Sequence, residues 1–213
     1  ILPQLGAPGV AAHQVKKRTG FHVEYGPVRA KDLPYYLDHG KATPEMRRVR
    51  FDLWDRLVLI PIEFVHGFIP FLIAAAVFYL LLGIWGAIGT VAAFVGGTIL
   101  FPLLLPWLPT QEFSLKGFFL GGILGFIVAW RAWQDATIWP VAARLGRSAA
   151  LLLGITVVTA WLALNFTGAT PITSQTGVAR EMRRYIRPMV ALAGLGLLLT
   201  LGVTIWRYTG GIR

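Results

Sequence analysis

Long runs of hydrophobic residues fill the chain after Leu57, whereas shorter hydrophobic stretches alternate with polar residues before it. The run from Leu57 to Leu105 has breaks near Gly83 and Gly86. It is too long for one membrane crossing and fits two, since each crossing needs about 20 residues. With the apolar segments that follow, the pattern predicts a membrane α-helical bundle of about five transmembrane helices. The predicted spans are residues 59–82, 85–105, 115–132, 148–166 and 188–206.

Residues 1–43 show the alternation of a short α/β segment. An apolar stretch ends at the turn Gly6–Gly9, and a helix with a basic end follows it. Residues 21–25 then alternate as a second strand would, and Gly26-Pro27 stops this strand before another helix opens near Asp32. The pattern predicts a βαβα unit with parallel strands. Because such a unit cannot bury a core without further strands, we expect additional residues upstream of this segment.

Residues 44–58 join the α/β segment to the spans and are rich in arginine. Thr43-Pro44-Glu45 has the pattern of a helix cap and first turn, so we expect an amphipathic element that runs to Arg56. Arginines clustered beside Trp54 are typical of a membrane interface. We therefore interpret this stretch as a basic juxtamembrane linker, and an ordinary solvated linker is the alternative.

Composition supports a membrane protein with one strongly basic segment. Of 213 residues, 55% are hydrophobic and 14% are charged, and the net charge is +10. The mean hydropathy of +0.62 makes lipid the expected surrounding for most of the chain. The basic block in residues 16–56 should face the cytoplasm, since Lys and Arg are retained on that side. Basic residues flank apolar spans here, which favours anionic lipid over nucleic acid as their partner.

An odd number of spans places the two ends of the chain on opposite sides of the membrane. With the N-terminal segment inside, the loop near Lys116 and the basic segment 167–187 are also inside, and the C-terminus is outside. Arg131, Arg144 and Arg147 then fall outside and disagree with the charge rule. We predict a multi-pass protein of the cytoplasmic membrane, with its soluble segment on the cytoplasmic side.

Glycines and prolines mark special places within the spans. Pro61, Pro70 and Pro102 are expected to bend their helices. Gly117, Gly121 and Gly125 lie four residues apart on one face, where the missing side chains let another helix approach closely. This stripe predicts packing inside the bundle, which we favour, or dimerisation.

Few residues in the spans carry catalytic chemistry. Glu63 and His66 are candidates, because ionisable groups at membrane depth are usually functional, although both lie near the start of their span. A stacked-haem cytochrome needs axial ligands inside the bundle, and His66 alone among the histidines lies in a span. An ion pump would need several buried carboxylates, and Glu63 is nearly alone in the spans. The chain has no cysteine, so it supplies no disulfide, no iron–sulfur ligand and no thiolate.

Two loops of the α/β segment are candidates for binding a ligand. Each follows a predicted strand, and loops at the carboxyl ends of parallel strands bind large planar or phosphorylated ligands. A plain tight connection between strand and helix is the alternative for the first loop. The candidate binding residues are Gln4, Leu5, Gly6, Ala7, Pro8, Gly9 and Val10 in the first loop and Gly26, Pro27, Val28 and Arg29 in the second.

Four stretches of the chain resemble the mercury-methylating corrinoid proteins (HgcA), which join a corrinoid-binding domain to a five-helix membrane domain. The stretches are LPQLGAPGVAAHQVKKRTG, YGPVRAKDLPYYLDHGKATPEMRRVRF, DRLVLIPIE and NFTGATPITSQTGVAREMR, in that order along both halves of the chain. The resemblance implies that residues 1–43 are the end of a Rossmann-like corrinoid-binding domain and that residues 59–213 are the transmembrane domain. The chain would be the C-terminal part of such a protein.

The resemblance implies a membrane-anchored methyltransferase. A methyl group held on the cobalt of a cobamide (cobalamin-type corrinoid) would pass to mercuric ion and give methylmercury, and a two-cluster 4Fe–4S ferredoxin of the HgcB type would return cobalt to its reduced state. The two candidate loops would bind the cofactor by backbone contact and shape, and no side chain is predicted to be catalytic. The family's lower ligand to cobalt is a cysteine in an Asn-Val-Trp-Cys motif, and this chain contains neither.

Two other functions stay open at this point. A membrane-bound corrinoid protein could deliver methyl groups to carbon chemistry of the acetyl-CoA type, or the chain could be a membrane anchor or scaffold without a reaction. Mercuric ion prefers thiolates, so its handling would depend on residues outside this chain. Under the main hypothesis, Thr170, Thr173 and Ser174 in the polar segment 165–187 would pack against the cofactor domain.

Overall fold

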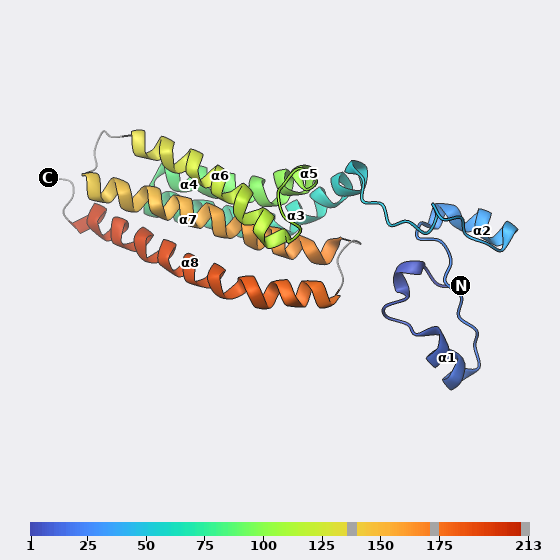
Figure 1. The fold of residues 1–213 in the computed structure, drawn as a ribbon. Helices are drawn as coiled ribbons and strands as arrows, with labels where there is room; N and C mark the ends of the chain where they lie inside the picture. Colours follow the sequence, from blue (N-terminus) through green and yellow to red (C-terminus); the bar gives the residue numbers. More distant parts are fainter. Residues whose placement is uncertain (136–139, 171–174, 210–213) are drawn as a thin grey trace. The chain divides into compact units, whose positions relative to one another are not determined.

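The computed structural model describes residues 1–135, 140–170 and 175–209 (Figure 1). The chain forms two compact units, Ile1–Phe51 and Asp52–Arg213. The boundary between them lies inside the predicted juxtamembrane linker.

The first unit consists of short helices joined by turns and extended segments. Its helical elements are η1 (Gln4–Gly6), α1 (Ala12–Thr19), η2 (Ala30–Asp32) and α2 (Leu33–His39). α1 and α2 confirm the two helices predicted for the α/β segment. Pro34 stands in the first turn of α2, where its missing N–H has no helical partner to lose.

The two predicted strands are absent from this unit as the structure describes it. What remains of them is one isolated parallel bridge between Leu2 and Tyr25. The amide of Leu2 donates to the Glu24 carbonyl at 2.8 Å, and the amide of Gly26 donates to the Leu2 carbonyl at 2.8 Å. The segments therefore meet in the predicted parallel direction, but no Rossmann-like sheet forms, because a stable sheet needs three or more strands or a covering layer.

The amphipathic element predicted to run from the cap at Thr43-Pro44-Glu45 to Arg56 is also wrong in its extent. Residues 44–47 form a turn, in which the amide of Arg48 donates to the Glu45 carbonyl at 3.1 Å. The helix begins only at Leu53, because Asp52 and Asp55 form a reciprocal capping box that satisfies the free amides of its first turn.

The second unit confirms five helices that are long and apolar enough to cross a membrane, so the chain is a multi-pass membrane protein. Figure 1 shows α6, α7 and α8 running side by side along this bundle. The elements are α3 (Leu53–Leu82), α4 (Ile84–Val95), η3 (Gly96–Leu100), α5 (Phe101–Leu104), α6 (Phe113–Gln134), α7 (Val141–Phe166), η4 (Thr167–Ala169) and α8 (Gln175–Thr209). The second span consists of α4, η3 and α5 in continuous succession.

The polar segment from Gln175 to Arg187 belongs to α8. α8 runs from Gln175 through Pro188 without a break. Thr173 and Ser174 lie outside the described residues, and the buried Thr170 donates its hydroxyl to the Thr167 carbonyl at 3.1 Å. The docking of this segment on a cofactor domain stays a prediction.

Glycine and proline decide where the first two spans turn and deform. Gly83 separates α3 from α4 with a φ of 73°, which glycine adopts without strain. A Cβ at Gly86 would lie 2.0 Å from the Phe78 carbonyl oxygen, so this tight connection also needs a glycine there. Before Pro102 the helix widens into the π-helical segment η3. The proline ring would clash with the carbonyl four residues earlier, and the wider turn relieves this clash.

The glycine stripe of α6 packs against α7 of the same chain. Added Cβ atoms would lie 2.6 Å from the Ala163 Cβ at Gly117, 2.8 Å from the Thr159 Cβ at Gly121 and 2.9 Å from the Leu152 carbonyl oxygen at Gly125. The stripe therefore serves packing inside the bundle, as we favoured, and α7 becomes the most buried span.

Arginines cap the carbonyl ends of helices in this bundle. The buried Arg56 donates from Nη1 to the carbonyls of Pro102 and Leu103, at 3.1 Å and 3.0 Å. Arg144 Nε donates to the Trp133 carbonyl at 3.1 Å, and the buried Arg147 donates to carbonyls at the end of α6. Cations at carbonyl ends are favourable because the helix dipole is negative there.

Candidate functional site

The structure places the two predicted cofactor loops on one side of the first unit's short bridge. In the first loop, Gln4, Leu5 and Gly6 form η1, Ala7–Gly9 form a turn, and Val10 leads toward α1. In the second loop, Gly26 and Pro27 are buried, whereas Val28 and Arg29 are partly exposed and lead into η2.

A shared turn brings the two loops together. The side-chain amide of Gln4 donates from Nε2 to the Arg47 carbonyl at 3.4 Å. The backbone amide of Val28 donates to the neighbouring Met46 carbonyl at 3.0 Å. Both loops are thus held by consecutive residues of one turn, which the sequence assigned to the linker and not to this site.

Two tyrosines hold the surroundings of these loops. The Tyr25 hydroxyl donates to the Val10 carbonyl and accepts from the Ala12 amide at 3.2 Å, so it joins the first loop to the start of α1. The buried Tyr36 donates to Glu24 Oε1 at 2.6 Å. The Glu24 carboxylate raises the pKa of Tyr36, because it accepts the hydroxyl proton and repels the phenolate.

The first loop has open space and one unused acceptor. A Cβ added at Gly9 would meet only the Gly6 carbonyl oxygen, at 3.7 Å, and one added at Gly6 would meet nothing within 4 Å. Gln4 Oε1 is buried and has no hydrogen-bond partner in the part of the chain that the structure describes. Gly26 differs, since its added Cβ would lie 2.9 Å from the Ile1 side chain. The open backbone at Gly6 and Gly9 could take the edge of a large planar ligand, whereas the buried Gln4 Oε1 is out of a ligand's reach.

The intramembrane candidates Glu63 and His66 do not come together with other chemistry-bearing groups. Both lie on α3, where Glu63 is partly exposed and His66 is exposed. Among the described residues, no group of three or more His, Cys, Asp or Glu side chains could hold a metal ion.

A polar clamp at the start of α6 was missed by sequence reasoning. Glu181 of α8 is buried and accepts the backbone amide of Ser114 in the first turn of α6. In return, Glu112 beside that turn accepts from the Tyr185 hydroxyl and from Arg184 Nη1, the latter at 3.0 Å. A carboxylate at a helix start is favourable, so Glu181 is an N-cap supplied by another helix. The lone acid within a run of arginines was the signal available in the sequence.

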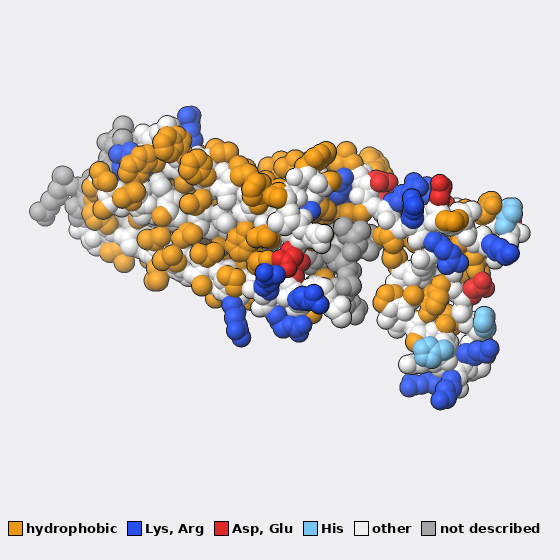
Figure 2. All heavy atoms as spheres, viewed as in Figure 1, with side chains coloured by type: hydrophobic (Ala, Val, Ile, Leu, Met, Phe, Trp, Pro, Cys, Tyr) orange, Lys and Arg blue, Asp and Glu red, His pale blue; other side chains and the backbone are white. Residues whose placement is uncertain are grey.

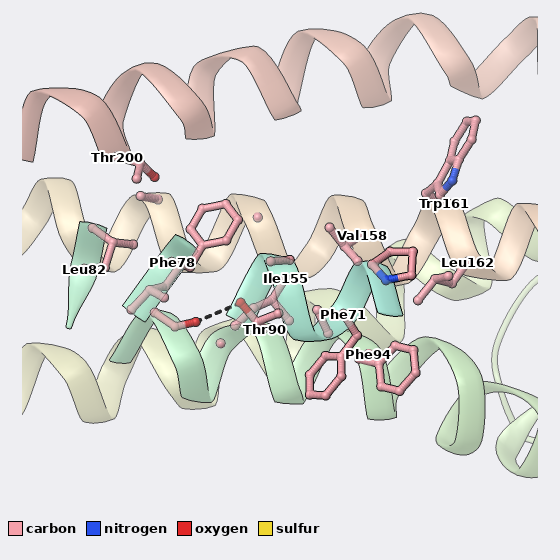
Figure 3. Close-up of a pocket in the computed structure, with 18 of the residues that line it drawn as sticks. Phe71, Phe78, Leu82, Thr90, Phe94, Ile155, Val158, Trp161, Leu162 and Thr200 are labelled. Atoms are coloured by element: carbon pink, nitrogen blue, oxygen red, sulfur yellow. Dashed lines mark hydrogen bonds between the residues drawn. The ribbon is translucent and has the colours of Figure 1, made fainter. Parts of the chain in front are cut away.

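An apolar cavity of about 390 Å³ in the bundle was also missed. It lies between α3, α4, α7 and α8, and Figure 3 shows Phe71, Phe78, Phe94 and Trp161 around it. Its two threonines are satisfied by their own helices, as the dashed bond from Thr90 illustrates, and the Thr200 hydroxyl donates to the Gly196 carbonyl. Apart from these threonines and the Trp161 indole, the lining consists of apolar side chains and glycine, and it suits hydrocarbon.

The chain matches no protein-family model, and comparisons with curated proteins and with solved structures found no similar protein or structure.

Proposed function

We propose that this chain anchors, and in part forms, a corrinoid-dependent methyltransferase that passes a cobalt-bound methyl group to mercuric ion to form methylmercury. The proposal rests on the resemblance of both units to the mercury-methylating corrinoid family. The observation that carries it in the structure is the convergence of the two cofactor loops on the turn at Met46 and Arg47.

The first unit would hold one edge of the cofactor. Gln4 would hold the first loop on the turn through its bond to the Arg47 carbonyl, and Gly6 and Gly9 would let the corrinoid approach the backbone of that loop. When bound, the corrinoid would supply the methyl group on cobalt, and this chain contributes binding and position. The partner would be a two-cluster ferredoxin that returns cobalt to the reduced state.

We infer the orientation of the chain in the membrane from the basic residues that do not cap helices. Of the three arginines that disagree with the charge rule, Arg144 and Arg147 bond to carbonyls at the end of α6, so packing accounts for their position, whereas Arg131 is exposed on α6. The remaining basic residues are concentrated in the first unit and at the start of α8. This distribution supports a cytoplasmic location for both, in the cytoplasmic membrane.

A membrane anchor without its own reaction is the second candidate. The observation that favours it is the five-helix unit itself, whose cavity is lined almost entirely by apolar side chains and glycine. In both cases the bundle serves to hold the first unit at the membrane.

Cobalt content of the anaerobically purified full-length protein tests the proposal. Corrinoid bands in the visible spectrum are expected, with Gln4→Ala and Gly9→Val lowering cobalt per protein while membrane yield stays unchanged. Gln14→Ala is the matched control, since Gln14 is exposed on α1, and it should leave cobalt content unchanged. Intact protein without corrinoid bands would support the anchor. Loaded protein that does not methylate added mercuric ion would support a carrier for carbon chemistry.

A further inference from the structure

The rotation of α8 about its own axis is fixed at its N-terminal end. Glu181, Tyr185 and Met189 lie one helical turn apart, and their exposed fractions are 8%, 9% and 2%. Glu181 caps α6, and Tyr185 donates to Glu112, so this stripe must face the bundle. The opposite face of the same turns consequently points away from the bundle.

That outward face carries arginines without protein partners. Arg180, Arg183 and Arg187 are exposed, and none of them has a hydrogen bond or ion pair in the described part of the chain. Arg184 differs, because it pairs with Glu112 at 3.0 Å. Figure 2 shows Lys and Arg side chains gathered at this end of the bundle, next to a surface that is mainly hydrophobic.

The arginines end where the lipid-facing surface of α8 begins. Val190 is 65% exposed, and Leu197 and Leu198 are 51% and 68% exposed further along the helix. From Arg180 to Arg187 the helix rises about 10 Å, at about 1.5 Å per residue. This rise is comparable to the headgroup layer, which is roughly 5–8 Å thick on each side of the hydrocarbon core.

We propose that Arg180, Arg183 and Arg187 bind the phosphate groups of anionic phospholipids in the membrane leaflet at this end of the bundle. Guanidinium groups match phosphate oxygens in charge and in fork geometry. A soluble anionic partner is less suited, because the arginines are continuous with the apolar face of α8. Lipid chains can cover that face while the phosphate groups of the same lipids stay beside the arginines, so the arginines are not desolvated. The site would fix the depth of α8 and, through the Glu181 cap, that of α6. It does not depend on the proposed corrinoid function.

Lipid composition around the full chain in nanodiscs provides the test. The discs contain phosphatidylcholine with a minor fraction of phosphatidylglycerol, and the lipids retained by the protein after detergent extraction are counted by native mass spectrometry. Each arginine near an anionic surface strengthens attraction roughly fivefold, so replacing all three by glutamine should weaken phosphatidylglycerol retention by up to about 100-fold at low salt. High salt should remove most of the wild-type preference.

The matched control replaces Lys16, Lys17 and Arg18, which end α1, by glutamine and so removes the same charge. It should retain phosphatidylglycerol as the wild type does, and equal losses in both variants would overturn a specific site on α8. Replacing the three arginines by lysine should preserve most of the preference, which checks that folding is intact. Wild-type retention equal to the bulk lipid ratio, or unaffected by the glutamine variant, would also overturn the proposal.

Discussion

Gly121 and Gly122 are neighbours on α6 that should respond in opposite ways to the same added methyl group. A Cβ at Gly121 would lie 2.8 Å from the Thr159 Cβ and 2.9 Å from both the Cα and the carbonyl oxygen of Thr156. A Cβ at Gly122 would meet nothing within 4 Å. The change to alanine is identical in both positions, so its effect on intrinsic helix propensity cancels between them.

The magnitude follows from the contacts that must be relieved. Carbon atoms prefer separations of about 3.5–4.0 Å, so α6 and α7 must part by roughly 0.6–1 Å at Gly121→Ala. Two of the crowded atoms belong to the α7 backbone and cannot rotate away. Overpacking of this kind costs about 1–3 kcal/mol, whereas replacing an unconstrained helical glycine gains about 0.5–1 kcal/mol. The unfolding free energies of the two variants should therefore differ by about 1–3 kcal/mol, with Gly122→Ala the more stable.

Unfolding of the purified variants in mixed micelles, followed by tryptophan fluorescence, measures this difference. Gly121→Ala should unfold at a lower denaturant concentration than the wild type, and Gly122→Ala should match or exceed it. Equal midpoints for the two variants would refute close α6–α7 packing as the role of the stripe. A change in oligomeric state for Gly121→Ala, with unchanged monomer stability, would instead favour dimerisation.

Three further outcomes are expected. Glu181→Ala should lower the unfolding free energy by about 1.5–3 kcal/mol, the contribution of a charge-assisted hydrogen bond, in the same micelle assay, and an unchanged midpoint would contradict the capping role. Tyr36 should titrate above pH 10, so its stabilising bond to Glu24 is present at neutral pH and is lost as the pH rises through the raised pKa. Glu24→Gln should lower the pH midpoint at which the phenolate absorbance of Tyr36 appears. An unchanged midpoint would contradict the pairing. Because the chain has no cysteine, Gln111→Cys and Gln134→Cys each introduce a single thiol, and an impermeant reagent should label only the second in intact cells; the reverse pattern would invert the proposed orientation.

Helices were predictable from the sequence wherever the surrounding lipid alone decides the local structure. The five spans were visible in the sequence because about 20 apolar residues can satisfy their backbone in lipid only as helices. Their ends were less visible. The helix α3 begins at Leu53, after the capping box at Asp52, and α8 begins at Gln175 and continues through Pro188. Both starts lie upstream of the predicted span starts at residues 59 and 188. The predicted strands failed for the opposite reason, since strand pairing depends on neighbours that a local pattern does not contain.

The candidate site divides in the same way. Its two loops stood out as glycine-rich breaks after apolar stretches, but the turn that joins them at Met46 and Arg47 is distant in sequence from Gln4. The clamp of Glu181 on α6 and the apolar cavity likewise have no local signature. Hydropathy and charge are properties of single residues and short segments, so they reveal which parts of this chain meet lipid and which carry its basic surface. Caps, close helix contacts and cavities are properties of pairs far apart along the chain, and they exist only once packing has brought those pairs together.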